Sequence, residues 1–279
     1  MTSPTLVQSK QGARIRFPRF SLSLYLAFLV ILVIAAWVLL PWLFTSHNPD
    51  VGIPTDKLQP PSSHYWFGTD QIGRDIYSRV VYGTASSVFT AFIAVAIGAI
   101  VGGLIGLVSG FSKSWGDIVL SRLVDVLLSI PSFLLAIIIV TSLGFDSVNA
   151  AIATGISSVG IFARVVRADV LRIRQMTYIE AAFLQGGSRG YILFRHVLPN
   201  ASRALIPLIT LRFGLSILVI AGLAFLGYGD PPPASDWGTL IATGRDYISW
   251  PWLVYAPAIV IVATVLSINR ISRWLRTVM

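Results

Sequence analysis

The sequence predicts an all-α integral membrane protein with six transmembrane helices. Of the 279 residues, 55% are hydrophobic and only 12% are charged, whereas a soluble domain usually carries about 25% charged residues. The apolar residues form long runs, and a helix that crosses a bilayer needs about 20 mostly apolar residues. The basic residues cluster between these runs, which is typical of segments beside a membrane and does not indicate nucleic-acid binding.

Six apolar runs are candidates for spans. They cover residues 22–44, 85–111, 118–143, 148–166, 204–227 and 252–271. The first run follows a basic tail, residues 1–20, as the core of a signal peptide would. Its apolar core exceeds the roughly 7–15 residues of such a peptide, and no small-x-small cleavage site follows it. We therefore expect a retained first span over residues 21–44.

The positions of Lys and Arg predict the orientation of the spans. With the N-terminus in the cytoplasm, the outer segments hold four of the 21 Lys and Arg residues, namely Lys57, Arg74, Arg79 and Arg245. Arg122 and Arg212 lie within or beside spans, and the other basic residues lie inside. We expect both termini in the cytoplasm, external segments at 45–83 and 228–250, and a long cytoplasmic segment at 168–203.

The second run carries a regular series of glycines. Gly98, Gly102, Gly106 and Gly110 are each four residues apart. On a helix they form nearly one stripe, and small residues in a stripe let another helix approach closely. We interpret the stripe as a packing seam; a lining for a substrate path is the alternative.

The third run contains a proline and a pair of opposite charges. Pro131 removes a helix hydrogen bond and is expected to kink the span. Arg122 and Asp125 are three residues apart near the cytoplasmic start of the run, so they can pair on one helix face. A structural role at the helix end and a place in a polar pathway are both open for Asp125.

Two features suggest a polar path through the membrane. The fourth run has few large aliphatic residues and contains Ser157 and Ser158; it either lines a pathway or packs tightly within the protein. Arg212 lies inside the fifth run, where a charge is costly and normally faces a partner or a wet cavity. It either lines the pathway or forms a buried ion pair, with Asp125 and Asp169 as the possible acidic partners.

The composition of the cytoplasmic segment predicts helices and not a flexible linker. The residues from Glu180 to Gln185 favour a helix, and Gly186 is suited to end it in a left-handed conformation. A second helical stretch begins at Gly190 and is expected to end at Leu198-Pro199, because the residue before a proline disfavours the helical region. The two short helices suit a rigid docking knob; an amphipathic helix lying on lipid is the alternative.

The spacing within this segment is specific. Glu-Ala-Ala is followed by Gly at the sixth position after Glu, and Leu-Pro stands twelve and thirteen residues further on. This pattern resembles the EAA signature of ABC importer permeases, and "RHVLPN" (195–200) is similar to its form in the peptide-importing subfamily. The resemblance implies a coupling helix that fits a cleft on a cytoplasmic ATPase. The residues it assigns to coupling are Glu180, Ala181, Ala182, Gly186, Arg195, His196, Leu198 and Pro199.

Two external stretches resemble the same family. "FGTDQIGRDIYSRVVYG" (67–83) and "LAFLGYGDPPPASDWGTLIATGRDYI" (223–248) are similar to segments of C-type subunits of dipeptide and oligopeptide permeases. The resemblance covers nearly everything after residue 64. It implies the type I ABC importer permease fold, with the core domain over residues 84–279. The C-terminus, "RISRWLRTVM", departs from the family's usual ending.

The resemblance also implies a set of partners. These are a second, B-type permease chain, two ATP-binding subunits that hold ATP and Mg, an external substrate-binding protein, membrane lipids and a peptide substrate, all at the cytoplasmic membrane of a bacterium or archaeon. Docking of the binding protein is one interpretation of four external residues, and local caps and ion pairs are the other. The four are Asp70, Arg74, Asp75 and Trp237.

The chain itself carries no sign of catalysis. No Gly-Lys pair occurs, so a phosphate-binding P-loop is excluded, and we expect no enzymatic activity and no cofactor in this chain. His47, His64 and His196 are scattered in the sequence without metal-ligand spacing, so no metal site is predicted.

Three other functions stay open at this stage. The same importer class could carry a non-peptide solute such as a nickel complex. An ion-coupled secondary transporter would use Arg212 for gating, although such proteins usually carry more intramembrane acids and internal repeats than this sequence shows. A scaffold subunit without a transport role is the third.

Overall fold

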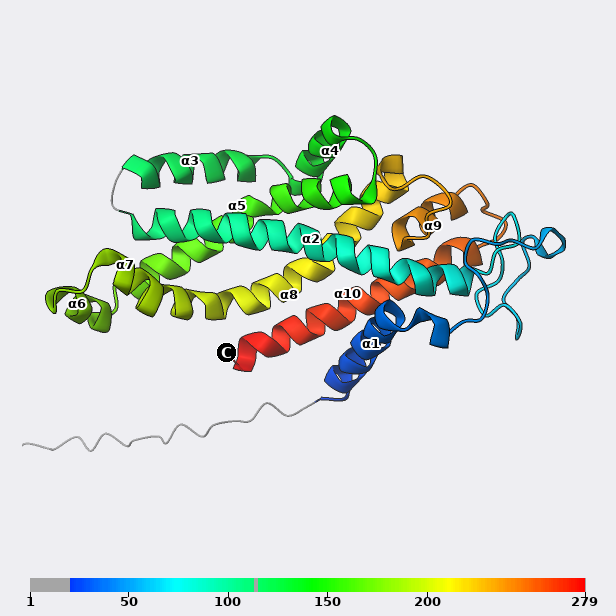
Figure 1. The fold of residues 1–279 in the computed structure, drawn as a ribbon, viewed down its shortest axis with the longest axis horizontal. Helices are drawn as coiled ribbons and strands as arrows, with labels where there is room; N and C mark the ends of the chain where they lie inside the picture. Colours follow the sequence, from blue (N-terminus) through cyan, green and yellow to red (C-terminus); the bar gives the residue numbers. More distant parts are fainter. Residues whose placement is uncertain (1–20, 113–114, 279) are drawn as a thin grey trace, which may run out of the picture.

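The structure is a computed structural model that describes residues 21–112 and 115–278. The N-terminal tail, residues 1–20, and Lys113 lie outside the described residues. Within them the chain forms helices and no β-strand (Figure 1). The α-helices are α1 (Leu22–Leu39), α2 (Ile76–Phe111), α3 (Trp115–Ser129), α4 (Ser132–Leu143), α5 (Ser147–Arg174), α6 (Thr177–Leu184), α7 (Arg189–Ile192), α8 (Leu198–Leu223), α9 (Trp237–Gly244) and α10 (Trp252–Val278).

Five helices are long and apolar enough to cross a membrane. They are α1, α2, α5, α8 with the turn that follows it to Tyr228, and α10. They correspond to five of the six apolar runs, and a sixth span is counted if α3 and α4 together form one. The prediction of an all-α membrane fold is confirmed.

The helix boundaries differ from the predicted ones mainly at α2. This helix begins at Ile76, so residues 76–83, which are predicted to belong to the external segment, are helical. The Asp75 carboxylate caps the helix by accepting hydrogen bonds from the backbone N–H groups of Tyr77 (3.2 Å) and Ser78 (3.0 Å). The polar residues of the first turns, Arg79 among them, conceal this start from a search for apolar runs.

The third run does not form one kinked helix. Its two halves, α3 and α4, meet at an angle of 93°. Figure 1 shows α3 nearly parallel to α2, whereas α4 is steeply inclined to both and lies beside α5. Pro131 precedes α4 in an extended conformation, with φ −53° and ψ 127°. A proline lacks the N–H that would continue α3 and clashes with its last turn, so the chain breaks there and restarts at Ser132.

The glycine stripe of α2 packs against α5, which confirms the packing interpretation. A Cβ added to Gly102 would lie 2.5 Å from the Val159 carbonyl oxygen, and one added to Gly106 would lie 2.5 Å from that of Ala163. From the other side, a Cβ on Gly155 of α5 would lie 2.9 Å from the Ala94 carbonyl oxygen. The two backbones therefore approach so closely that only glycine fits at these positions.

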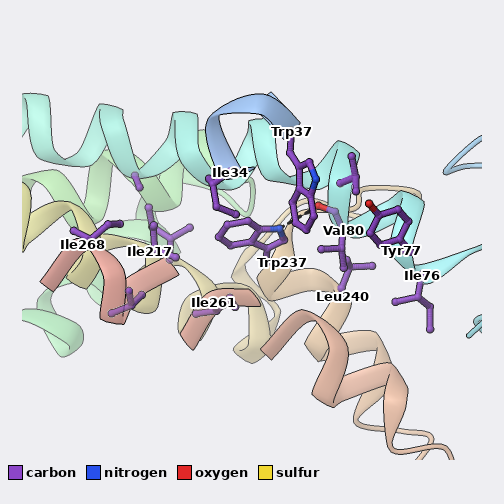
Figure 2. Close-up of a cluster of buried hydrophobic side chains, with 14 of the residues drawn as sticks. Ile34, Trp37, Ile76, Tyr77, Val80, Ile217, Trp237, Leu240, Ile261 and Ile268 are labelled. Atoms are coloured by element: carbon purple, nitrogen blue, oxygen red, sulfur yellow. Dashed lines mark hydrogen bonds between the residues drawn. The ribbon is translucent and has the colours of Figure 1, made fainter. Parts of the chain in front are cut away.

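A cluster of buried hydrophobic side chains joins α1, α2, α8, α9 and α10. Figure 2 shows Trp237 of α9 at its centre, between Trp37 of α1 and Ile261 of α10. The Trp237 indole is fully buried, and its Nε1 donates a hydrogen bond to the Val80 carbonyl oxygen (3.2 Å). An indole N–H usually finds such a partner when it is buried, and here the bond fixes α9 on α2.

We predict that Gly102→Ala destabilises the chain by about 1–3 kcal/mol, because the new methyl group must push two backbones apart. Gly103→Ala is the matched control, since a Cβ there meets nothing within 4 Å and alanine favours a helix by up to about 1 kcal/mol. Thermal unfolding of the purified chain in detergent measures both. Equal unfolding temperatures for the two variants would contradict the seam.

Candidate functional site

The sequence motifs gather at the two ends of the bundle. Figure 1 shows α6 and α7 at one end, and α9 with the segment before α2 at the other. The segment between α5 and α8, residues 175–197, is called here the α6–α7 segment. The residues between Phe44 and Asp75, together with residues 229–236, are called the external cap, after their predicted side.

The α6–α7 segment has the predicted two short helices and glycine turn. α6 ends at Leu184, and Gly186 follows with φ +84°, a left-handed conformation that favours glycine. The side chain of Ser188 then caps α7 by accepting a hydrogen bond from the backbone N–H of Tyr191 (3.3 Å). A Cβ on Gly186 would meet nothing within 4 Å, so this glycine serves the backbone conformation and not packing.

The predicted helix end at Leu198-Pro199 is wrong. α7 continues through a π turn, Leu193–Val197, directly into α8, which begins at Leu198 and holds Pro199 in its first turn. The first turn of a helix tolerates proline because its N–H would have no partner there. The pair therefore starts the long helix and connects the α6–α7 segment rigidly to it.

The α6–α7 segment is anchored from below by buried aliphatic side chains. Ile179, Ile192 and Val197 are fully buried and pack with Leu107 of α2 and Val170 of α5. Such a cluster removes the segment's freedom to tilt independently of the spans.

An arginine adds a polar anchor at the same place. Nη1 of Arg174 donates hydrogen bonds to the carbonyl oxygens of Gly110 (3.2 Å) and Phe111 (3.3 Å), at the C-terminus of α2. Terminal carbonyls of a helix lack an internal partner, and a cation is favoured beside them. Sequence reasoning did not single out Arg174, because nothing local indicates that α5 and α2 end side by side.

His196 braces the two short helices. Its ring makes edge contacts with the rings of Tyr178 (centroids 6.2 Å apart) and Tyr191 (5.7 Å). Nδ2 of Asn200 donates to the His196 carbonyl oxygen (2.7 Å) and to the Tyr178 hydroxyl (3.2 Å). Tyr178 and Asn200 were missed as site residues, since 22 positions separate them and only the turn at Gly186 brings them together.

The outer face of the segment is both apolar and charged. Leu184, Phe194 and Tyr191 are 89%, 67% and 57% exposed, and Glu180 and Arg195 are exposed beside them. Within the described residues, the Glu180 carboxylate has no hydrogen-bond or ion-pair partner; the backbone N–H of Glu180 donates to the Met176 carbonyl oxygen (3.4 Å). Exposed apolar side chains with charges at their rim are typical of a surface that contacts another protein. Ala181 is exposed and Ala182 half-buried on the same helix.

At the other end, a buried carboxylate organises the external cap. Oδ2 of Asp70 accepts hydrogen bonds from Arg74 Nε (2.7 Å) and Arg79 Nη1 (3.0 Å), and its Oδ1 accepts from the Arg74 N–H (2.9 Å). Nη2 of Arg79 donates in turn to the carbonyl oxygens of Pro233 (3.0 Å) and Ala234 (2.8 Å). The two external motifs, far apart in the sequence, are thus joined through Arg79.

The four residues considered for docking a binding protein are buried in this chain. Asp70, Arg74, Asp75 and Trp237 are none of them more than 5% exposed. Asp75 caps α2 and Trp237 fills the core, while Asp70 and Arg74 pair with each other. The alternative interpretation, local caps and ion pairs, is what the structure shows; burial keeps these side chains from an external partner.

Two other carboxylates of the external cap are perturbed by their surroundings. Asp236 caps α9 by accepting hydrogen bonds from the N–H groups of Gly238 and Thr239 (both 3.1 Å), and burial raises the pKa of its carboxyl. The Tyr65 hydroxyl donates to Asp56 (2.7 Å), which raises the pKa of Tyr65 to about 12 and lowers the pKa of Asp56. The Asp236 carboxylate thus holds the start of α9, and the Asp56 carboxylate holds Tyr65 within the external cap.

Two of the three histidines that appear scattered in the sequence meet in the external cap. The rings of His47 and His64 make an edge contact, with centroids 5.2 Å apart, and Nδ1 of His47 lies 3.8 Å from Asp75 Oδ2. His196 lies at the other end. Among the described residues no group of three or more His, Cys, Asp or Glu side chains could hold a metal ion.

The charges within or beside the predicted spans separate into paired and unpaired ones. Asp125 pairs with Arg164 of α5 (3.0 Å) and not with Arg122 as expected, and Asp169 pairs with Arg172 (3.1 Å). Arg212 is half-buried on α8 and has no hydrogen-bond or ion-pair partner in residues 21–112 and 115–278. The predicted acidic partners of Arg212 are therefore engaged elsewhere.

The two serines of the fourth span are buried within the bundle. Ser157 and Ser158 lie on α5, and the Ser157 hydroxyl donates to the Thr154 carbonyl oxygen (2.8 Å). A Cβ on Gly98 of α2 would approach the Ser158 Cβ to 3.1 Å. Of the two interpretations of this span, tight packing describes these serines.

Chains of solved ABC transporters share this arrangement of helices. A chain of the MetNI methionine ABC transporter, solved in inward-facing conformations, superposes with a TM-score of 0.59 at 19% identity, covering 72% of this chain and 96% of that one. An amino acid ABC transporter gives a TM-score of 0.57 at 17% identity, covering 73% and 95%. At these identities the likeness concerns the fold alone.

The sequence comparisons are more specific. Residues 102–278 match the family described as binding-protein-dependent transport system inner membrane component. The chain is 41% identical to the dipeptide transport system permease protein DppC of Alkalihalophilus pseudofirmus, over 90% of this chain and 84% of the relative. It is 38% identical to the glutathione transport system permease protein GsiD of Escherichia coli O6:K15:H31, over 94% and 86%. The chain belongs to this family of inner-membrane permeases.

We predict that Asp70→Ala destabilises the chain by about 3–5 kcal/mol, since it leaves two buried guanidinium groups without their counter-charge. Asp246→Ala is the control: its ion pair with Arg245 (3.6 Å) is exposed and is worth about 1 kcal/mol or less. Thermal unfolding of both purified variants is the measurement. Similar losses at the two sites would show that the Asp70 cluster is not the anchor of the external cap.

Proposed function

We propose that this chain is one of two permease subunits of an ATP-driven importer, and that it forms with a second, B-type permease the path for di- and oligopeptides. The structure of the α6–α7 segment supports this proposal most. Its outer surface exposes Glu180, Leu184 and Phe194, and its buried aliphatic side chains pack against α2 and α5. Family membership, and relatives whose names specify dipeptide and glutathione transport, support the substrate class.

The partners follow from this function. Two cytoplasmic subunits bind and hydrolyse ATP with Mg and receive the α6–α7 segment in a cleft. An external binding protein delivers the peptide to the opposite face of the membrane. The chain lies in the cytoplasmic membrane of a bacterium or archaeon with both termini inside, as the distribution of Lys and Arg supports.

The mechanism is a rigid-body coupling. Closure of the two ATPases moves the α6–α7 segment, and α8 moves with it because no loop separates them. α5 and α2 follow through the buried cluster around Ile179 and through the glycine seam. The path then changes from inward-facing to outward-facing, so that ATP and peptide bias one two-state element.

A substitution in the turn at Gly186 tests this rigid-body coupling, in which the α6–α7 segment acts as a lever on α8. We expect Gly186→Val to assemble normally but to hydrolyse ATP with little peptide uptake, because a β-branched residue at φ +84° costs about 1–2 kcal/mol or more and reshapes the turn. Gly186→Asn, which tolerates this conformation, should keep most uptake, and Gly190→Ala is a control on the same exposed face. Uptake and ATPase activity are measured in proteoliposomes containing the whole complex. Full uptake by the assembled Gly186→Val complex would refute the lever.

We further propose that Arg212 lines the path and holds a carboxylate of the peptide. A half-buried guanidinium without an acidic partner among the described residues is available for one, and such a charge-assisted bond is worth about 1.5–3 kcal/mol. Arg212→Gln should therefore lower uptake at subsaturating peptide on the order of tenfold or more, while Arg273→Gln should not. The contrary result is unchanged uptake together with lower thermal stability, which would identify an ion pair to the second permease.

One competition experiment separates peptides from other solutes of the same importer class. Unlabelled peptides of graded length are added to proteoliposomes that take up a labelled dipeptide, and a nickel complex is added in parallel. Competition by peptides alone supports the proposal; competition by the nickel complex alone would replace the substrate class. Uptake driven by an ion gradient without ATPase subunits would instead favour a secondary transporter.

A further inference from the structure

The end of the bundle beside the α6–α7 segment contains a basic cavity. It has a volume of about 560 Å³ and lies between the ends of α5, α8 and α10. Three arginines line it, one from each helix: Arg172, Arg203 and Arg276. Among the described residues, no acidic side chain lines the cavity. We call this the arginine pocket.

The charges of the arginine pocket are mostly uncompensated. Arg172 pairs with Asp169 (3.1 Å), but this pair is partly exposed. Arg203 and Arg276 are exposed, and neither guanidinium group has a hydrogen-bond or ion-pair partner among the described residues. Like charges that converge on one cavity repel each other, and an anion held between them offsets the repulsion. Guanidinium groups are suited to phosphate because their donors match its oxygens in pairs.

The remaining lining indicates that the anion carries apolar parts. Val165, Ile173, Met176, Pro207 and Leu208 supply apolar wall, and Asn200 adds an amide. The cavity lies at the ends of three helices that are long and apolar enough to cross the membrane, on the side that the distribution of Lys and Arg predicts to be cytoplasmic. Basic pockets between spans at the cytoplasmic side are where phospholipid headgroups are bound in other membrane proteins.

We propose that the arginine pocket binds the phosphate group of an anionic phospholipid. The guanidinium groups of Arg203 and Arg276 hold the phosphate, and the apolar wall contacts the start of the acyl chains. Met176 directly precedes α6, and Asn200 bonds to Tyr178 of that helix. A lipid bound in the pocket therefore contacts two residues that hold α6 in place, and so stabilises the position of the α6–α7 segment. This proposal does not depend on the identity of the transported substrate.

The first test is lipid binding by the purified full chain. Native mass spectrometry counts bound phosphatidylglycerol and, in parallel, the zwitterionic phosphatidylcholine. Arg203→Gln and Arg276→Gln should each weaken phosphatidylglycerol binding on the order of tenfold, which corresponds to about 1.4 kcal/mol. Arg273→Gln is the matched control, because Arg273 is exposed on the same helix three residues away and does not line the pocket. Equal binding by all three variants would overturn the proposal.

A second arm distinguishes a lipid phosphate from a soluble one. If inorganic phosphate raises the unfolding temperature as much as phosphatidylglycerol, and Arg203→Gln and Arg276→Gln abolish both effects, the pocket binds phosphate but its source is soluble. Stabilisation by phosphatidylglycerol alone supports the lipid.

A third measurement tests whether a protein covers the pocket instead. The ATPase subunits that co-purify with each variant are quantified in parallel. Loss of these subunits with unchanged lipid binding would show that the pocket is a protein contact, and would overturn the proposal. Both arginines lack partners in the described chain, so neither substitution is expected to unfold it.

Discussion

The close approach of α2 and α5 is the constraint on which the rest of the structure depends. Glycines at Gly102, Gly106 and Gly155 remove the side chains that would hold the two backbones apart. Without this approach, the last turn of α2 could not present its carbonyl oxygens to Arg174. The packing of α2 on α5 thus fixes the position of the C-terminal end of α5 beside that of α2. The α6–α7 segment starts from this end of α5.

The same helix pair connects both ends of the molecule. α2 begins at the external cap, where Arg79 holds residues 233 and 234, and it ends beside the α6–α7 segment. A second close approach occurs near its start, since a Cβ on Gly83 would lie 1.7 Å from the Ser235 carbonyl oxygen. One continuous helix of 36 residues therefore carries glycine contacts to α5 and to the external cap, which favours their movement together.

The sequence predicts the features that depend on local periodicity and spacing. The apolar runs identify the spans, the four-residue repeat of glycine identifies the seam, and the Gly at position 186 identifies the turn. Each of these is decided within one or two helical turns, where hydropathy and backbone preference act alone. The EAA spacing marks the same segment only through its resemblance to ABC importer permeases, and the coupling role that this resemblance implies belongs to the proposed function.

Other features depend on contacts that spacing does not reveal. Pro131 indicates a distortion, but the 93° angle between α3 and α4 is set by how α4 packs on α5. Pro199 follows a residue that should leave the helix, yet the buried side chains of Ile192 and Val197 hold the chain helical through a π turn. Asp70, Arg74 and Asp75 resemble an exposed charged patch in the sequence, and the fold places them inside.

A polar motif between spans can therefore have two opposite physical meanings. In the external cap the Asp70 carboxylate is paired with Arg74 and Arg79 within the chain. Burying these charges is costly, so each needs the others as partners. In the α6–α7 segment Glu180 is left without a partner while the aliphatic side chains beneath it are fully buried. Internal satisfaction indicates a structural clamp, whereas an unsatisfied charge on a rigid base indicates a surface prepared for another protein. Under the proposed function, motion driven by ATP therefore enters at the α6–α7 segment, while the external cap stays joined to α2 because its charges are paired within the chain.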